Sequence, residues 1–278
     1  MENVTLEELQ KQIAALQDKL DRVDDYRKIM NVYSKFWHYY EMGKYEERFD
    51  LIAHHTPGVT VEIGARGVFE GRESAHRSLV DTELGFEHSH AVGMKRLFPD
   101  VDFPSEHAGM LESTLIGSPI IEIAEDRKTA HGVFIALQSV AKTHDNDPKP
   151  RSMWIWWKTA IEFVNEDGIW RFWHFNNNPY YATGSTEDWV TNAVHMAGLR
   201  MPDDPEGYVP SGGPGGPAPK KDAEKGNQTG GHSHYTTADR PTTSFYRSYR
   251  ITALPLEIPL PEPYKTFDES FSYEPEKS

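Results

Sequence analysis

Four side chains in the sequence carry the acid and base groups that proton-transfer chemistry requires. Tyr40 and Glu41 stand together in HYYEMG, His90 lies in FEHSHAVG, and His174 lies in WRFWHFNNN. A phenol can polarise a carbonyl or protonate a departing hydroxide, and an imidazole can remove or return a proton near neutral pH. Each of these residues could instead be a buried hydrogen-bonding group, so their spacing and the elements that hold them have to be considered.

Tyr33 and Tyr40 are seven residues apart in a predicted helix over 25–43, so they share one helical face. Ile29 and Phe36 lie on the same face, which could therefore be simple core. Buried tyrosine hydroxyls need hydrogen-bond partners, however, and this keeps a role in a pocket open for Tyr33 and Tyr40.

A predicted strand over 151–163 alternates between two faces. One face carries aromatic and aliphatic side chains together with Arg151, and its members are Arg151, Met153, Ile155, Trp157, Thr159, Ile161 and Phe163. The other face, with Trp154, Trp156, Lys158 and Glu162, is expected to point to solvent or to a neighbouring subunit. Trp157 and Phe163 would then line or underlie a concave pocket that suits a flat substrate, and aromatic core is the alternative.

The last predicted strand ends in a run of hydrogen-bonding groups. Under strict alternation, His174 and Asn176 share a face with Trp170 and Phe172. A histidine beside an asparagine is suited to orienting a substrate hydroxyl, and we predict that both point into the cavity. The alternative is that the strand simply leaves the core here, with the exit turn at 177–179.

Signatures of metal and nucleotide binding are weak or missing in the sequence. His88 and His90 would share a face in an extended segment, but a metal site needs a third ligand, and nothing fixes Glu62 or Glu87 nearby. The GPGGP stretch has no strand before it and no GK[ST] after it, so it is not a phosphate loop. We therefore predict no metal and no cofactor.

Composition restricts the partners of the 278-residue chain. A net charge of -14 argues against nucleic acid or an anionic membrane as a partner, because phosphate binding requires clustered Lys and Arg. The absence of cysteine excludes disulfides and a cysteine nucleophile. The first residues are polar, and no apolar run approaches the roughly 18 residues of a membrane helix. The expectation is a soluble cytoplasmic protein.

The order of the predicted elements indicates the α+β class. An N-terminal helix is predicted to begin with Thr5 and Glu8 as a capping box, and it has an a/d heptad stripe formed by Leu6, Leu9, Ile13, Leu16, Leu20 and Val23. We expect this helix to dock on a neighbouring subunit or on its own domain. Further helices are predicted at 25–43, 44–55 and 72–85, and a short strand is predicted in 58–71, between the last two of them. Four long strands follow from about 114, with hairpin turns at EDRK and NEDG. Helices should therefore pack on one face of a curved antiparallel sheet.

These elements resemble the NTF2-like superfamily, the cone-shaped α+β barrel of the SnoaL-like proteins, ketosteroid isomerase and scytalone dehydratase. The resemblance covers residues 25–181 and includes the strand VTVEIG, the helix that opens GRESAH, and the hairpin EFVNEDGIWRFWHF. It implies a helix-backed cone with a pocket on the concave face. It implies little about function, because this fold serves enzymes, carriers and scaffolds.

Two local matches to scytalone dehydratase imply roles for particular residues. Tyr40–Glu41 is similar to a Tyr-Asp pair at the end of the first long helix, with Glu in place of Asp, and His90 in HSHAVGM matches a pocket histidine. A second pocket histidine of that enzyme falls near Val140 and is absent, so scytalone itself is not expected as the substrate. The resulting predicted site has Tyr40, Glu41, His90 and His174 as catalytic residues. The predicted substrate contacts are Tyr33, Arg151, Trp157, Phe163 and Asn176.

The C-terminal region has a different character from the rest. It is rich in Gly and Pro, and PEPYKTFD at 261–268 is similar to a motif of bacterial SnoaL-like proteins with C-terminal extensions. We predict a heptad helix at 1–24, an NTF2-like domain at 25–183, and an extension at 184–278 that wraps its own or a neighbouring subunit of a trimer.

This resemblance implies activity on plant-derived aromatic compounds. The predicted function is a cofactor-independent lyase that dehydrates or cleaves a small hydroxylated aromatic compound, including loss of formaldehyde from a lignin-type diarylpropane. The alternatives are a SnoaL-type isomerase or cyclase, and a non-catalytic protein that binds a small molecule.

Overall fold

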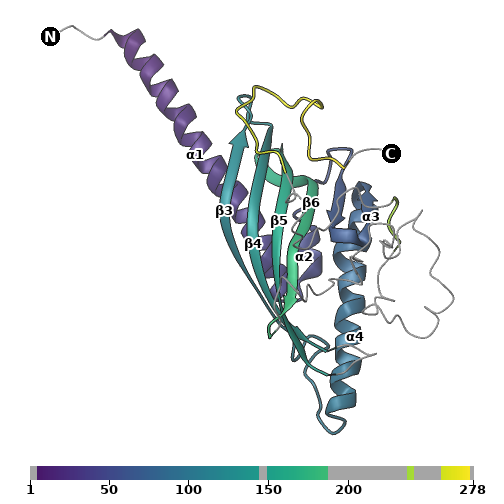
Figure 1. Cartoon of the computed structure of the whole chain (residues 1–278). Coiled ribbons are helices and arrows are strands. Elements are labelled where there is room, and N and C mark those ends of the chain that lie inside the picture. The colour runs from purple at the N-terminus through teal and green to yellow at the C-terminus, as the bar shows by residue number, and fades with distance from the viewer. Residues whose placement is uncertain (1–4, 144–148, 187–236, 241–257, 276–278) are drawn as a thin grey trace.

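A computed structural model describes residues 5–143, 149–186, 237–240 and 258–275 of the chain (Figure 1). The helices are α1 (Leu6–Glu41), α2 (Tyr45–Phe49), α3 (Gly71–His76) and α4 (Thr82–Leu97), with a 3₁₀ turn at Gly64–Arg66 and a π-helical turn at Arg77–Asp81. The strands are β1 (Thr60–Ile63), β2 (Val68–Glu70), β3 (Leu111–Ile123), β4 (Thr129–Lys142), β5 (Arg151–Glu166) and β6 (Ile169–Gly184).

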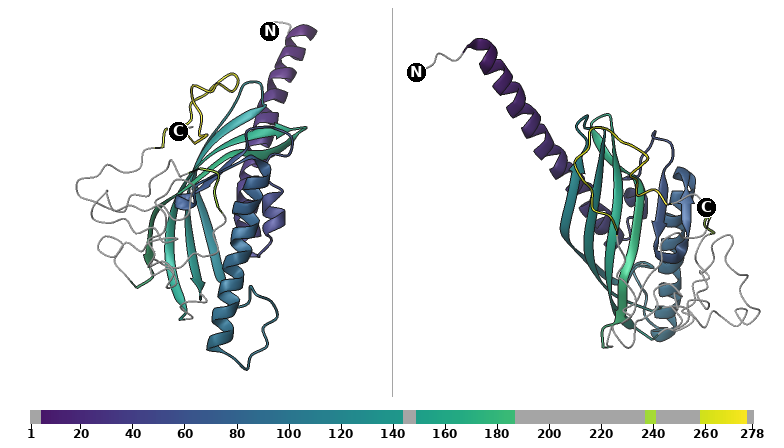
Figure 2. Two further views of the ribbon diagram at one scale, coloured as in Figure 1. Left: turned by 90° about the vertical axis from the view of Figure 1, so that its right-hand side faces the viewer. Right: turned by 45° about the horizontal axis from the view of Figure 1, so that its top comes forward.

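The six strands form one curved sheet in the order β2-β1-β6-β5-β4-β3. All neighbouring strands are antiparallel except β1 and β6, which are parallel. The helices cover the concave face, as the two turned views show (Figure 2). The predicted α+β arrangement is confirmed, and the sheet is mixed because β1 joins it beside β6 after a connection through the rest of the chain.

The two predicted hairpin turns lie where their composition placed them. Asp167 and Gly168 connect β5 to β6 with positive φ values of 54° and 87°, which a two-residue turn of type I′ requires. Glycine takes this conformation without a steric cost, and aspartate tolerates it better than most residues. The turn at 124–128 connects β3 to β4, with Arg127 at a φ of 57°.

Helix α1 is one element where the sequence predicted two. No glycine or proline occurs between Leu6 and Glu41, so nothing interrupts the helical hydrogen bonds at the expected boundary near residue 24. The predicted capping box is present, because the Thr5 hydroxyl accepts from the Glu8 amide and Glu8 accepts from the Thr5 amide. Gly43, with a φ of 66°, follows the end of the helix.

Two other helix boundaries differ from the prediction. Helix α2 ends at Phe49 rather than at residue 55, because Ile52 forms a β-bridge with Phe172 and the Ala53 amide donates to the Phe172 carbonyl. The helix expected at 72–85 continues through the π-helical turn into α4 and ends at Leu97. His88 and His90 are therefore helical, and residues two apart on a helix point in different directions rather than sharing a face.

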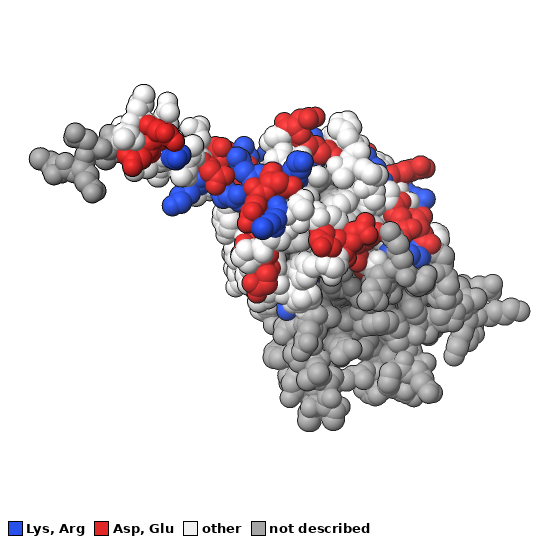
Figure 3. Space-filling model, turned by 90° about the horizontal axis from the view of Figure 1, so that it is seen from above, with Lys and Arg blue, Asp and Glu red and all other residues white. Residues whose placement is uncertain are grey.

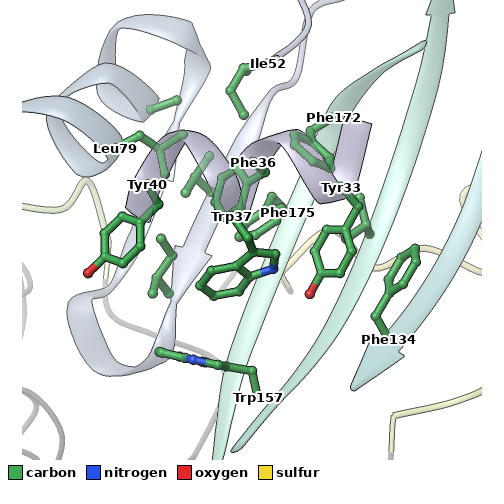
Figure 4. Packing of buried hydrophobic residues seen from close by; sticks show 14 of the residues in the cluster. Tyr33, Phe36, Trp37, Tyr40, Ile52, Leu79, Phe134, Trp157, Phe172 and Phe175 are labelled. Atoms are coloured by element: carbon green, nitrogen blue, oxygen red, sulfur yellow. The ribbon is translucent and has the colours of Figure 1, made fainter. Parts of the chain in front are cut away.

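The core lies between α1 and the concave face of the sheet. Tyr33, Phe36 and Trp37 of α1 pack against aromatic side chains of β4, β5 and β6, and Figure 4 shows this packing. The Tyr33 ring stacks on Phe134 at 4.2 Å between centroids, and the Phe36 ring lies 4.6 Å from Phe175. The predicted inner face of β5 is confirmed from residue 155 onward, where alternate side chains through Phe163 are buried.

A β-bulge in β6 reverses the predicted orientation of its second half. Phe172 pairs with Phe163, but His174 pairs with Glu162, so Trp173 is an extra residue in the ladder. Phe172 and Phe175 both point into the core, while His174 and Asn176 lie on the convex face. The prediction that His174 and Asn176 share the inner face with Phe172 is therefore wrong, because a single inserted residue shifts every later side chain to the opposite face.

Part of the C-terminal region packs on the convex face of its own sheet. Residues 258–275 cross the outer side of β4 and β5, and the amides of Glu125 and Asp126 donate to the carbonyls of Tyr264 and Lys265. We refer to residues 258–275 as the C-terminal arm. The rest of the extension predicted at 184–278 lies largely outside the described residues. Across the described ranges, no helix has the length and apolar character to span a membrane.

Candidate active site

A cluster of buried polar side chains lies on the concave side of the sheet, where α1 ends, β3 begins and β4 ends. Its members come from five elements, namely Tyr40 (α1), Arg48 (α2), Glu83 (α4), Glu112 (β3) and the partly buried Lys142 (β4). Charged groups are rarely buried unless their partners are supplied with them. The concentration of such groups makes this cluster the candidate active site.

Tyr40, Glu112 and Lys142 form the centre of this cluster. The Tyr40 hydroxyl donates to Glu112 Oε1 at 3.2 Å, and Lys142 Nζ lies 3.4 Å from the same oxygen. The second carboxylate oxygen, Glu112 Oε2, is buried and has no hydrogen-bond partner among the described residues. One oxygen is thus held by the protein while the other is buried without a partner, which is unusual for a carboxylate.

The surroundings of Glu112 favour its protonated form. Burial raises the pKa of Glu112 above its ordinary value of 4.5 and the negative charge of Glu83 adds to this, while Lys142 and Tyr40 oppose it. Burial also raises the pKa of Tyr40 well above 10.0, with further contributions from Glu112 and Glu83. A carboxyl whose pKa moves toward neutrality can both accept and return a proton, as acid–base catalysis requires.

A buried ion pair supports Tyr40 from the opposite side. Glu83 Oε1 accepts from Arg66 at 2.7 Å and from Arg48 at 3.4 Å. The Arg48 guanidinium also lies over the Tyr40 ring, 4.6 Å from its centroid. Burial acts to raise the pKa of Glu83, but the two arginines outweigh it and leave the pKa below its ordinary value. Glu83 is therefore a fixed anion that orients the arginines.

His90 borders this cluster, and both of its ring nitrogens are hydrogen-bonded to backbone groups. Its Nε2 donates to the Ala108 carbonyl at 2.9 Å, and its Nδ1 accepts from the Thr143 amide at 3.0 Å. Burial lowers the pKa of His90, and Lys142 adds to this effect. The ring thus connects the 98–110 loop to the end of β4, next to Lys142, and its geometry is that of a positioning residue rather than of a base.

Glu41 points away from the hydroxyl of its neighbour Tyr40. Its carboxylate accepts from the Thr114 amide at 2.5 Å, and His38 lies 3.5 Å from its second oxygen. Successive residues on a helix project about 100° apart, so two adjacent side chains rarely reach one target. Glu41 connects α1 to β3, and Glu112 occupies the place beside Tyr40 that the sequence assigned to Glu41.

His174 lies on the other side of the sheet. Its Nδ1 contacts Glu162, and its Nε2 donates to the Gly58 carbonyl at 2.9 Å. His174 thus links Glu162 of β5 to the backbone that precedes β1. The structure therefore does not bring His174 together with Tyr40 and His90.

The predicted substrate contacts fall into three groups. Tyr33 and Phe163 are completely buried core, and the Tyr33 hydroxyl bonds to Thr159 at 2.9 Å. Trp157 is on the concave face, where its indole donates to Gln138 at 2.9 Å and its ring lies 6.2 Å from Trp37. Asn176 is on the convex face, and Arg151 is exposed at the start of β5, opposite Lys142.

Sequence reasoning missed Arg48, Glu83, Glu112 and Lys142. A signal for two of them was present, because β4 carries Phe134, Ala136, Gln138, Val140 and Lys142 on its inner face. Gln138 and then Lys142 interrupt that apolar series. Glu112 is likewise a charged residue on the inner face of β3, at the end that lies beside them. Arg48 and Glu83 lie on helices where charged residues are common, so no local pattern distinguishes them. Within the described ranges, no three potential metal ligands come together.

A family model for the SnoaL-like domain matches residues 21–176, which is more than half of the chain. The chain therefore belongs to the SnoaL-like family, and its fold is the NTF2-like cone that the sequence predicted. A comparison with curated proteins gave no match.

Several solved structures share the fold at low identity. A hexachlorocyclohexane dehydrochlorinase, LinA type 2, is 15% identical, has a TM-score of 0.46 and is similar over 61% of this chain and 95% of its own. A protein provisionally designated a scytalone dehydratase, from Novosphingobium aromaticivorans, is 14% identical with a TM-score of 0.44, over 60% and 91%. LinA type 3 from Novosphingobium barchaimii is 15% identical with a TM-score of 0.41, over 61% and 96%. The activities in these names belong to those proteins, and similarity at this level carries none of them over.

Proposed function

We propose that the chain is a lyase that carries out acid–base elimination on a small hydroxylated aromatic compound at Tyr40 and Glu112. The observation that carries the proposal is the buried Glu112 carboxyl, which has one oxygen bound by Tyr40 and Lys142 and the other without a partner. Burying a carboxylate oxygen without a hydrogen-bond partner costs free energy. A ligand group that donates to Glu112 Oε2 removes this cost.

The pair can complete a full elimination without external proton carriers. Glu112 Oε2 removes a proton from a substrate carbon, and the electron pair of that C–H bond forms the new double bond. The adjacent C–O bond breaks, and the Tyr40 hydroxyl gives its proton to the departing oxygen, which leaves as water. The proton on Glu112 then returns to Tyr40, whose oxygen lies 3.2 Å from Glu112 Oε1, and the site is restored.

The same pair can also serve carbon–carbon cleavage. If Glu112 takes the proton of a primary hydroxyl instead, the electrons of that O–H bond form the carbonyl of formaldehyde. The broken C–C bond supplies the new double bond, and the benzylic oxygen leaves as water after protonation by Tyr40. A 1,2-diarylpropane-1,3-diol would thus give a stilbene, formaldehyde and water. One proton donor and one acceptor are sufficient in both cases.

The surroundings of the pair suit an aromatic ring with a polar substituent. The rings of Tyr45 and Trp37 each lie 6.2 Å from the Tyr40 ring. Lys142 Nζ lies 5.2 Å from the centre of the Phe86 ring, so a cation and an aromatic face are both next to Glu112. A lysine at this distance can stabilise a phenolate on the substrate, which assists departure of a benzylic hydroxyl.

The proposal is tested by the turnover of two compounds that share a benzylic hydroxyl group and differ in whether they carry a primary alcohol. The probes are a 1,2-diarylpropane-1,3-diol with a para-hydroxyl group and its analogue without the primary alcohol, followed by chromatography, mass and formaldehyde release. We expect loss of water from both probes, and formaldehyde only from the first. A product of unchanged mass would instead identify an isomerase, and binding without any product would identify a binding protein.

Tyr40→Phe is expected to lower kcat on such a substrate by about 10²-fold or more, because the variant keeps the ring and removes the proton donor. Tyr39→Phe is the matched control, since Tyr39 is the preceding residue on α1 and makes no contact with Glu112. Equal rates for Tyr40→Phe and Tyr39→Phe would exclude Tyr40 as the proton donor.

A further inference from the structure

The first half of α1 projects from the body of the protein as a single helix. Figures 1 and 2 show the N-terminal half of α1 extending beyond the sheet, and Figure 3 shows acidic and basic residues along the projection. At its inner end the Arg22 guanidinium donates to the carbonyls of Ala124 and Glu125, which is where the helix reaches the β3–β4 turn. Residues 6–20, which precede this contact, are all exposed.

An apolar stripe runs along this projection. Its six members are between 45% and 72% exposed, although large aliphatic side chains normally avoid water, and they are Leu6, Leu9, Ile13, Leu16, Leu20 and Val23. The spacing alternates between three and four residues, which is the a/d pattern of a helix that packs against another helix. The prediction that the stripe docks on its own domain is not met within the described residues, where the stripe is exposed.

The chain supplies a limit to the stripe at each end. The capping box of Thr5 and Glu8 fixes the start of the helix one residue before Leu6. At the inner end, Arg27 occupies the next a position, and two arginines facing each other there would repel. The stripe therefore covers 18 residues, about 27 Å at 1.5 Å per residue.

We propose that residues 6–23 of α1 pair with the same segment of a second copy of this chain as a parallel coiled coil. The flanking charges support the parallel direction. In a parallel pair the g residue Lys19 lies beside the e residue Asp24 of the second copy, and this ion pair forms twice. In the antiparallel register that opposes Leu6 to Val23, Lys19 faces Gln12, and no e or g ion pair forms.

The ion pairs already present on α1 do not prevent Lys19 from pairing with Asp24 of the second copy. Asp24 already binds Arg27 at 2.7 Å and Lys28 at 2.9 Å, but both are exposed contacts within one helix, and a carboxylate accepts more than two donors. The other ion pairs, Lys11–Glu7 and Arg22–Asp18, lie off the seam. Fewer than three heptads give a weak pair on their own, so association should depend on protein concentration.

The assembly state of the full chain tests the proposal. Sedimentation velocity over a range of concentrations should show a mass at least twice that of one chain, and Leu9→Glu with Leu16→Glu should reduce the mass of the assembly at least two-fold. The matched control is Ala14→Glu with Ala15→Glu, which adds the same charge to the same helix but on its outer side. A monomeric wild type, or a double stripe variant with unchanged mass, would overturn the proposal.

The direction of pairing has its own test, because the chain has no cysteine. Leu6→Cys introduces one thiol, and a parallel pair brings two such thiols together, so mild oxidation should give a covalent dimer. An antiparallel pair would hold them about 26 Å apart, since Leu6 then faces Val23, 17 residues along the helix. Lys11→Cys, on the outer side, should remain uncrosslinked. Crosslinking only when Leu6→Cys is mixed with Val23→Cys would show that the direction is wrong.

Discussion

Glu112→Gln is expected to lower kcat by about 10²–10⁴-fold while the melting temperature stays the same or rises. Glutamine fills the same space and still accepts from Tyr40 and Lys142, but it cannot take a proton from the substrate. Stability should not fall because the folded-state pKa of Glu112 is raised. The contribution of such a group to stability is present below its ordinary pKa of 4.5 and is lost as pH rises through the raised value, so at neutral pH the charged carboxylate is unfavourable.

The pH dependence of the rate gives a second view of Glu112. Its carboxylate form is the base, so kcat/KM of the wild type should rise with pH through a pKa above 4.5, and Glu112→Gln should lack this rise. Glu106→Gln is the matched control, because Glu106 is an exposed partner of His88 in the loop before β3. If Glu112→Gln keeps wild-type turnover, or unfolds the protein, Glu112 is a structural residue and the proposed site is wrong.

Glu162→Gln is expected to destabilise the protein by about 3–5 kcal/mol and to release the C-terminal arm. The buried Glu162 carboxylate contacts His174 and His131 on the sheet, and it accepts from the Ser272 hydroxyl at 2.9 Å and the Tyr273 amide at 3.0 Å. Removing the anion leaves the buried His174 ring without its carboxylate partner. The C-terminal arm also loses the carboxylate to which Ser272 and Tyr273 are hydrogen-bonded.

The response to acid should follow the pKa of Glu162. Burial acts to raise this pKa, but His131 and His174 outweigh it and lower the pKa from 4.5 to about 2. The stability from Glu162 is therefore present above pH 4.5 and is lost as pH falls toward 2, and it amounts to roughly 3 kcal/mol. In Glu162→Gln this part of the acid transition should disappear.

Hydrogen exchange and urea unfolding measure the two effects of Glu162→Gln separately. The amide of Tyr273, protected in the wild type by its bond to Glu162, should exchange faster, and the unfolding midpoint in urea should fall. Glu269→Gln is the control on the arm itself, because Glu269 is exposed. Wild-type protection of Tyr273 in the variant would show that aromatic packing, such as the stacking of His131 on Tyr264 at 4.4 Å, holds the arm without the carboxylate.

Strand patterns were the most informative part of the sequence. The alternation in β5 correctly separated Trp157 and Phe163, which are buried in the core, from the exposed Trp154, because a strand without bulges keeps a period of two. The same reasoning was wrong for His174, since Trp173 is inserted as a bulge. A bulge depends on the register of the neighbouring strand, and no residue type in WRFWHF indicates its presence.

Helix lengths were less predictable, for a related reason. Local propensity identified the capping box at Thr5, but the end of α2 is set by a bridge from Ile52 to Phe172, more than a hundred residues away. The site was only partly predictable in the same way. Tyr40 was found through the resemblance of its segment, whereas Glu112 and Lys142 become its neighbours only when β3 and β4 are placed beside the end of α1.

The position of a bound substrate tests the central claim most directly. A crystal structure of Glu112→Gln should be determined with a compound that the wild type consumes, since the variant would hold that compound without turnover. We predict that the reacting hydroxyl lies within hydrogen-bonding distance of the Tyr40 hydroxyl and that a substrate hydrogen donor faces position 112, next to Lys142. A compound bound on the convex face near His174, or at any place away from Tyr40, would contradict the account.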